Sequence, residues 1–142
     1  MTKSKLSGLV IKTPWIDLII AGKKTWEIRG CRTEVNRPIA LIQSGTGLVI
    51  GACALVECRG PLALPEMKRT SRYHRIKFQR GDALPYHKTY AWILNDAVRF
   101  VVPVPYTHPR GAVIWVNLTQ HNVEEFKRLQ KLMPTVLPNP SN

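Results

Sequence analysis

The pattern of apolar and polar positions predicts a chain built mostly of short β-strands. Runs that are apolar, or that alternate with period two between turn residues, recur at residues 9–11, 25–29, 39–43, 48–57, 89–94, 98–104 and 112–118. Asn95 and Asp96 predict a hairpin-like turn between two of these runs. Helical patterning is confined to a stretch that opens at Thr13 and to residues 123–133.

Because the strands are short and would pair with partners distant in the sequence, we expect an α+β, mainly β fold. The predicted architecture is a small closed or half-closed β-barrel of about six strands with helices on its rim. Gly51 interrupts one run and predicts a bulge or a close backbone approach. The 142 residues fit a single domain, 1–142, in which residues 134–142 are expected to be a disordered tail.

The first helix has clear start and stop signals. Thr13 is a suitable N-cap, and Pro14 suits the first helical position, where its missing N–H group costs nothing. Gly22 suits the left-handed position that closes a helix. The helix is therefore expected to end just before two lysines.

These lysines form a polar junction with the next strand. Alternation over residues 25–29 places Glu27 and Arg29 on one face of the strand and Trp26 on the other. An ideal strand would also place Lys24 opposite Glu27. Lys24 and Glu27 can converge only if the turn after the helix holds Lys24 outside the regular strand. If it does, this junction is the candidate site.

The net charge of +12 indicates a polyanionic partner, of which nucleic acid is the commonest for a small protein. Arg32, in a loop, and Arg69, Arg72 and Arg75, in the basic segment of residues 66–90, are candidate contacts for the phosphate backbone. A solvated surface is an equal alternative for the basic segment. An anionic membrane is another possible partner, but no long basic amphipathic helix supports it.

Other chemistry is largely excluded. The three cysteines and four histidines form no metal-binding spacing and no disulfide framework, so we expect reduced thiols, no metal and a cytoplasmic protein. No segment has the length of a signal peptide or membrane span. The phosphate-binding glycine motifs and hydrolase signatures are absent, and no cofactor is expected.

The stretch PWIDLIIAGKKTWEIRG resembles the signature of the ASCH domain, a member of the PUA-like superfamily. The stretches PIALIQSGTG, IGACALVECRG and YAWILNDAVRF, with a closing PRGAVIWV, are similar to later strands of that family. The resemblance covers roughly residues 8–118 and implies a PUA-type barrel with a cleft beside the junction. It also implies RNA binding, with which ribonuclease activity has been associated in the family.

One bacterial branch of the family hydrolyses acylated cytidine, using a lysine, a threonine three residues later and a distant glutamate. By this resemblance Lys24 matches the lysine, whereas Glu27 stands in the place of the threonine. A carboxylate cannot replace the alkoxide, but Glu27 could act as a general base on water while Lys24 stabilises an oxyanion. Glu57 and Glu66 are the candidates for the distant glutamate.

A nucleobase pocket needs flat walls and polar groups that read the base edge. Trp26, Tyr90 and Trp92 are candidate walls, whereas Trp15 and Trp115 are expected in the core. Glu27 could accept from an exocyclic amine, and Arg29 or Lys24 could meet a phosphate or carbonyl. The resemblance places Ser44 near the pocket. The histidines, His108 among them, are expected at the surface.

Three functions remain open. The first is an RNA-binding or single-stranded-nucleic-acid-binding protein with a base-accommodating cleft and a basic backbone-binding surface, with ribonuclease activity as an option. The second is an amidohydrolase acting on an N4-acylated cytidine or a related modified nucleoside, and the third is a non-catalytic reader of a modified base. We expect a monomer or weak dimer with no membrane partner.

Overall fold

The computed structural model describes residues 6–119 and residue 131. Along the chain the elements are β1 (Ser7–Ile11), α1 (Trp15–Ile20), β2 (Trp26–Arg29), β3 (Arg37–Gln43), β4 (Leu48–Arg59), α2 (Leu64–Arg69), α3 (Ser71–His74), β5 (Tyr90–Pro105) and β6 (Trp115–Asn117). The expected mainly β fold with few short helices is confirmed.

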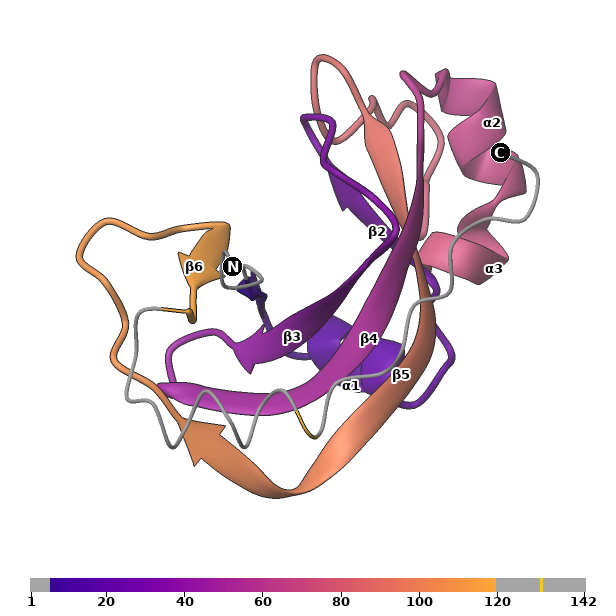
Figure 1. Ribbon diagram of the computed structural model, residues 1–142. Helices are drawn as coiled ribbons and strands as arrows, with labels where there is room; N and C mark the ends of the chain where they lie inside the picture. The colour runs from indigo at the N-terminus through magenta and orange to yellow at the C-terminus, as the bar shows by residue number, and fades with distance from the viewer. Residues whose placement is uncertain (1–5, 120–130, 132–142) are drawn as a thin grey trace.

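The six strands form one sheet in the order β2-β5-β4-β3-β1-β6. β1 and β3 run parallel, and the other neighbours are antiparallel. The sheet curls into a half-barrel, with α2 and α3 together beside its β2 end (Figure 1). β2 and β6 are therefore the two edges of a barrel that does not close by strand pairing.

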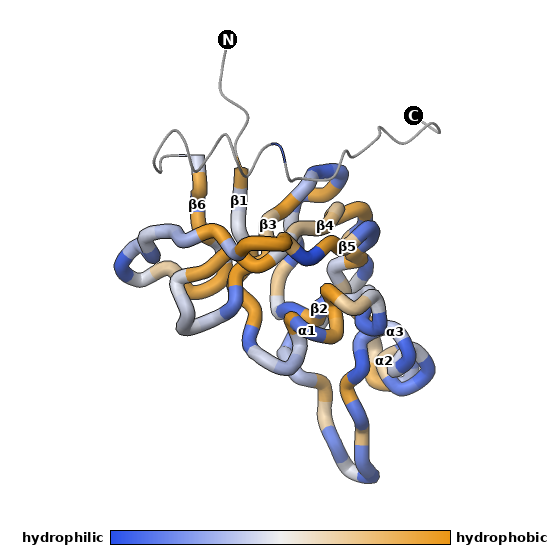
Figure 2. The backbone as a smooth tube through the Cα atoms, turned by 90° about the horizontal axis from the view of Figure 1, so that it is seen from below, coloured by the Kyte–Doolittle hydropathy of each residue, from blue (hydrophilic) through white to orange (hydrophobic). Residues whose placement is uncertain are grey.

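The main core lies between α1 and the curved sheet. Ile16 and Ile19 of α1 pack with apolar side chains of β1, β3 and β4, including Cys53, which is fully buried as expected of a small core residue. Figure 2 shows the apolar colour concentrated along β1, β3 and β4, whereas hydrophilic residues dominate α2 and α3. Among the described residues, no helix has the length and apolar character needed to cross a membrane.

The prediction of a hairpin-like turn at Asn95 and Asp96 is wrong. β5 runs through both residues as one strand, and Asp96 adopts a φ of 55°. The pairing register with β4 shifts there, with Ala54 opposite Asn95 and Ala52 opposite Val98. The polar pair therefore forms a bulge that bends a long strand, because the strand has a continuous partner in β4.

Gly51 confirms the expectation of a bulge and a close approach. The β4–β5 register shifts between Val49 and Gly51, and a Cβ at Gly51 would overlap the carbonyl oxygen of Val98. Only glycine lets the two backbones come this close.

The helix signals are only partly confirmed. Pro14, rather than Thr13, is the N-cap of α1, and no side chain caps the helix; the Thr13 hydroxyl instead contacts the Gln43 amide at 3.3 Å. The basic segment contains most of α2 and all of α3 at its start, although its sequence shows no firm apolar period. The helix expected over residues 123–133 and the tail 134–142 lie outside the described residues, except for residue 131.

Candidate functional site

Lys24 lies in the turn between α1 and β2. Gly22, with a φ of 77°, follows the helix, and the amides of Lys23 and Lys24 both donate to the Leu18 carbonyl, at 2.9 and 3.0 Å. These bonds keep Lys24 outside the regular strand. Strand alternation therefore does not separate Lys24 from Glu27, and both side chains line one cleft.

The Lys24 ammonium group is almost fully enclosed. It donates to the carbonyls of Trp26 and His74, both at 2.7 Å, and lies 3.5 Å from Glu27 Oε1 and 4.9 Å from the centre of the Trp15 ring. Burial lowers the pKa of Lys24, and the Glu27 carboxylate partly opposes this shift. Lys24 can therefore stabilise a developing negative charge, or release a proton more readily than an exposed lysine.

Glu27 lies between two cations. Its Oε2 accepts from Arg29 Nη2 at 2.9 Å and from Arg29 Nε at 3.3 Å, while Oε1 faces Lys24. Arg29 Nη2 also donates to the Val10 carbonyl at 3.0 Å, which links the edge strand β2 to β1. The row of Lys24, Glu27 and Arg29 carries two positive charges against one negative, so it favours an electron-rich or anionic ligand.

The cleft has a volume of about 740 Å³, which suits a ligand of nucleoside size. Its aromatic lining comes from Trp15 at the start of α1, Tyr86 in the loop before β5 and Tyr106 just after β5. Trp15 also packs against the main core. The expectation that it is only a core residue is therefore incomplete.

Other polar residues line the cleft in addition to Lys24, Glu27 and Arg29. Ser44 lines the cleft from the turn after β3, as the resemblance implied. His108 also lines it, with Nδ1 at 2.8 Å from the Tyr106 hydroxyl and Nε2 at 2.8 Å from the Ala112 carbonyl. Because a carbonyl only accepts, Nε2 donates to Ala112, and in the neutral ring Nδ1 then accepts from the Tyr106 hydroxyl. Burial raises the pKa of Tyr106.

Sequence reasoning missed Tyr86, Tyr106 and His108 as cleft residues. They belong to segments far from the lysine turn along the chain and reach it only because the sheet curls. The only signal available was a tyrosine and a histidine two apart, directly after a strand that ends in prolines.

The three aromatic residues expected as walls do not line the cleft. Trp92 is fully buried, stacks on Trp115 at 5.5 Å between ring centres, and lies below the Arg29 guanidinium at 5.8 Å. Tyr90 is 8% exposed, and Trp26 faces α2 and α3 on the other side of β2. Strand pairing places Trp92 beside Glu27, but neighbouring side chains cover it.

The four arginines assigned to the nucleic-acid backbone also lie outside the cleft. Arg32 donates to a backbone carbonyl at 2.8 Å and lies over Tyr90, whereas Arg75 donates to the carbonyl of Lys23 at 2.6 Å. Arg69 and Arg72 are exposed on α2 and α3. Among these, Arg75 alone contacts the lysine turn through its side chain in the part of the chain that the structure describes.

Neither candidate for the distant glutamate reaches the cleft. Glu57 pairs with Arg59 at 2.8 Å on the surface, and Glu66 accepts the Ala63 amide at 3.4 Å where α2 begins. Within residues 6–119 and 131, no group of three His, Cys, Asp or Glu residues could hold a metal ion, and the three cysteines are free. Burial raises the pKa of the Cys53 thiol to about 12.

This half-barrel with a cleft at its helix-to-strand junction has the architecture of a known family. The model of the ASCH domain family matches residues 9–130, and the chain belongs to this family. A search of curated proteins found no match to this chain.

Solved structures of an ASCH protein from Zymomonas mobilis share the fold. That protein has a TM-score of 0.64 at 19% identity, covering 94% of this chain and 99% of the other. A serine-to-alanine variant of it gives 0.65 at 19% identity, covering 94% and 100%. A tyrosine-to-phenylalanine variant has a TM-score of 0.62 at 18% identity, covering 92% of this chain and 100% of the other. At this identity, the likeness establishes the fold alone.

Proposed function

We propose that this ASCH protein binds RNA and that the cleft accommodates one unpaired nucleobase. The observation that carries the proposal is the Glu27 carboxylate, held between Lys24 and Arg29 on the floor of an aromatic-lined cleft. A carboxylate in this position accepts a hydrogen bond from an exocyclic amine such as that of cytosine. The surrounding rings offer faces and edges for base contacts.

The arrangement suits recognition because it is set before a ligand arrives. Arg29 holds one oxygen of Glu27 and is itself held by the Val10 carbonyl, while Lys24 has acceptors for its ammonium protons. Oε1 of Glu27, which faces Lys24 while Oε2 accepts from Arg29, keeps a lone pair for a ligand. Binding therefore needs little reorganisation of the floor of the cleft.

Fluorescence anisotropy with labelled single-stranded RNA at low salt tests the proposal. Replacing Glu27 by Gln exchanges an acceptor for a mixed donor and acceptor, and we expect affinity for cytosine-containing RNA to fall by about tenfold or more. Glu34→Gln removes the same charge at an exposed position and is the matched control. Absence of binding to any RNA or single-stranded DNA by the wild type would refute the proposal.

A second candidate function is amide hydrolysis of an N4-acylated cytidine. The observation that favours it is that Lys24 and Glu27 meet in the cleft, 3.5 Å apart. Glu27 would remove a proton from water, the resulting hydroxide would attack the amide carbonyl, and Lys24 would stabilise the oxyanion. Collapse of the tetrahedral intermediate expels the cytosine amine, which takes up a proton, and leaves a carboxylic acid.

Incubation with acetylcytidine followed by chromatography tests this reaction. We expect cytidine and acetate from the wild type, loss of turnover in Lys24→Met and retained turnover in Lys23→Met, which changes the exposed neighbour. No product from the wild type, or equal turnover in both variants, would refute hydrolysis by this pair. Binding without turnover would favour the non-catalytic reader.

Ribonuclease activity is a third option at the same cleft. The feature that favours it is His108, which lines the cleft and whose Nδ1 could act as a general base on the attacking 2′-hydroxyl group once that hydroxyl replaces Tyr106 as its partner. A denaturing gel of RNA incubated with the wild type and with His108→Ala tests this option. Cleavage by both proteins alike would assign it to a contaminant.

A further inference from the structure

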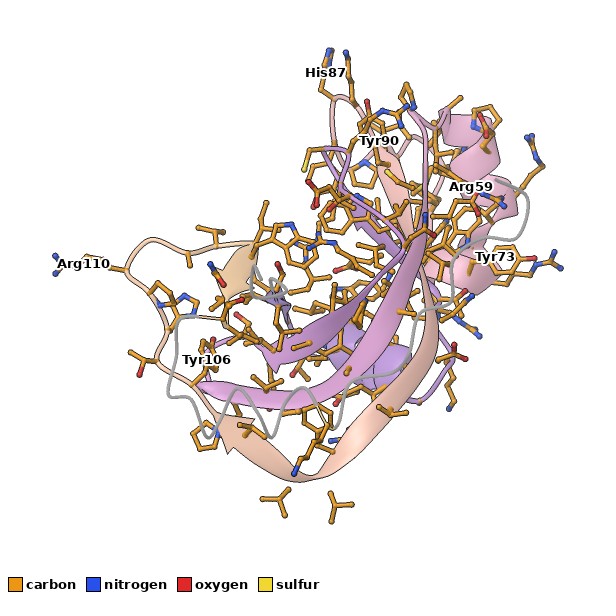
Figure 3. All side chains as sticks on the ribbon, viewed as in Figure 1. Arg59, Tyr73, His87, Tyr90, Tyr106 and Arg110 are labelled. Atoms are coloured by element: carbon orange, nitrogen blue, oxygen red, sulfur yellow. The ribbon has the colours of Figure 1, made fainter. Side chains whose placement is uncertain are left out.

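The outer face of β2 carries a second cluster of aromatic and cationic side chains. Trp26 stacks on Tyr73 with ring centres 5.0 Å apart and planes inclined by 20°. The Arg59 guanidinium lies 5.4 Å from the centre of the Trp26 ring, and that of Arg72 lies 4.7 Å from the centre of the Tyr73 ring. We call Trp26, Arg59, Arg72 and Tyr73 the outer cluster. Arg59 and Tyr73 lie on the opposite side of the molecule from Tyr106, which lines the cleft (Figure 3).

Of the cations in and beside the outer cluster, Arg59 pairs with the Glu57 carboxylate at 2.8 Å, whereas the others have no carboxylate partner in the part of the chain that the structure describes. Lys68, Arg69 and Arg72 are exposed, and none forms an ion pair among the described residues. α3 follows α2 after one residue, so these three cations lie close together along the chain, and like charges at short range repel each other. Glu66 is engaged at the start of α2. A bound anion would relieve this repulsion.

The shape of the outer cluster selects the kind of anion. Trp26 is only 7% exposed, so no slot admits a base between it and Tyr73. Guanidinium groups resting on rings, with further cations beside them, instead suit the phosphate oxygens of an extended strand. The outer cluster therefore fits a phosphodiester backbone rather than a nucleobase.

The outer cluster is tied directly to the lysine turn. The Thr25 amide donates to the Tyr73 carbonyl at 2.9 Å, and Lys24 Nζ donates to the His74 carbonyl at 2.7 Å. The segment that carries the surface arginines therefore also holds Lys24. A ligand on the outer face and a base in the cleft would contact two sides of one short strand.

From this arrangement we infer that the outer cluster, with Lys68 and Arg69, binds the phosphodiester backbone of the strand whose base enters the cleft. The inference rests on the proposed RNA-binding function and adds a second contact site on the far side of β2. Such a contact is independent of base sequence and sensitive to salt, because each phosphate neutralised releases counterions.

The test compares Arg69→Ala and Arg72→Ala with Arg110→Ala, which removes an exposed arginine from the opposite side of the molecule (Figure 3). The probe is a labelled single-stranded RNA of about 16 nucleotides, measured over a range of salt concentrations. We expect the slope of log affinity against log salt to fall by about 0.7 in each outer-face variant and to stay unchanged in Arg110→Ala. Arg69→Lys and Arg72→Lys should restore the slope, because they restore the charge.

Two further measurements separate the possible failures. Wild-type and Glu27→Gln affinities for the same RNA report on the cleft alone. RNA binding that depends on Glu27 while the outer-face variants match Arg110→Ala would overturn this inference and leave the proposed function standing. No RNA binding at all would overturn both. Binding to phosphatidylserine vesicles but not to RNA, lost in Arg72→Ala, would overturn the inference in favour of a membrane surface.

Discussion

The two faces of β2 differ in how their charges are satisfied. On the cleft face, Lys24, Glu27 and Arg29 are largely buried, and each is bonded to another of the three or to a backbone carbonyl. On the outer face, Arg69 and Arg72 are exposed and have no carboxylate partner among the described residues. Both faces are positively charged, but only the cleft face has its geometry set by internal bonds.

This difference suggests a division of labour. Buried, hydrogen-bonded charges are costly to move, which suits recognition of the shape and edge of a base. Exposed cations contribute little to folding and suit a flexible phosphate chain, which they attract over several ångströms. Stability measurements should therefore respond strongly to changes on the cleft face and weakly to changes on the outer face.

The largest effect is expected for Lys24→Met. The substitution leaves the Glu27 carboxylate without one of its two cations and removes the donor from two buried carbonyls. We expect the free energy of unfolding in urea to fall by about 3–5 kcal/mol. Lys23→Met should change it by less than about 0.5 kcal/mol. Equal effects of the two variants would contradict the contrast between the faces.

An intermediate effect is expected at His74, which lies between the faces. Its ring is fully buried, with Nε2 at 2.7 Å from the Met67 carbonyl and Nδ1 accepting the Ile76 amide at 3.0 Å. Only the neutral ring satisfies both bonds, and burial lowers the pKa of His74. The unfolded chain therefore binds a proton at higher pH than the folded chain, and stability should fall as pH drops below about 6.5.

Urea unfolding at pH 6.5 and pH 5.5 measures this effect, which cannot exceed about 1.4 kcal/mol per pH unit for one group. His74→Asn should remove this part of the pH dependence, whereas His87→Asn, at an exposed position, should retain it. An unchanged pH dependence in His74→Asn would show that another group titrates in this range.

The smallest effect on stability is expected for Arg69→Ala. The side chain is exposed on α2 and bonds to no carboxylate in residues 6–119 and 131. We expect the free energy of unfolding to change by less than about 0.5 kcal/mol, measured by urea denaturation. A loss as large as that of Lys24→Met would mean that the outer face is structural and would weaken its assignment to ligand binding.

The sequence could predict the local parts of the site because local rules govern them. Gly22 closes the helix, and alternation places Glu27 and Arg29 on one face of the strand, so the sequence alone locates the junction. Gly51 likewise predicts its bulge, because any other residue would place a Cβ against the Val98 carbonyl oxygen. Each of these features depends on a few neighbouring residues.

The remaining parts depend on how the sheet closes. Asn95 and Asp96 have turn chemistry, yet a continuous partner strand makes them a bulge. Trp92 lies beside Glu27 in the pairing but is covered by Trp115, a residue from the last strand. Tyr86 and Tyr106 enter the cleft for the same reason, since curvature brings distant loops to the lysine turn. No periodicity within one segment carries that information.

The central claim is that the two faces of β2 take different parts of one ligand. Titration of ¹⁵N-labelled protein with cytidine 5′-monophosphate, followed by amide chemical shifts, tests it most directly. We expect saturable shifts at Lys24, Glu27 and Ser44, with shifts at Arg69 and Arg72 appearing only when a longer single-stranded RNA replaces the mononucleotide. Saturable shifts confined to Arg69 and Arg72, with none in the cleft for either ligand, would contradict it.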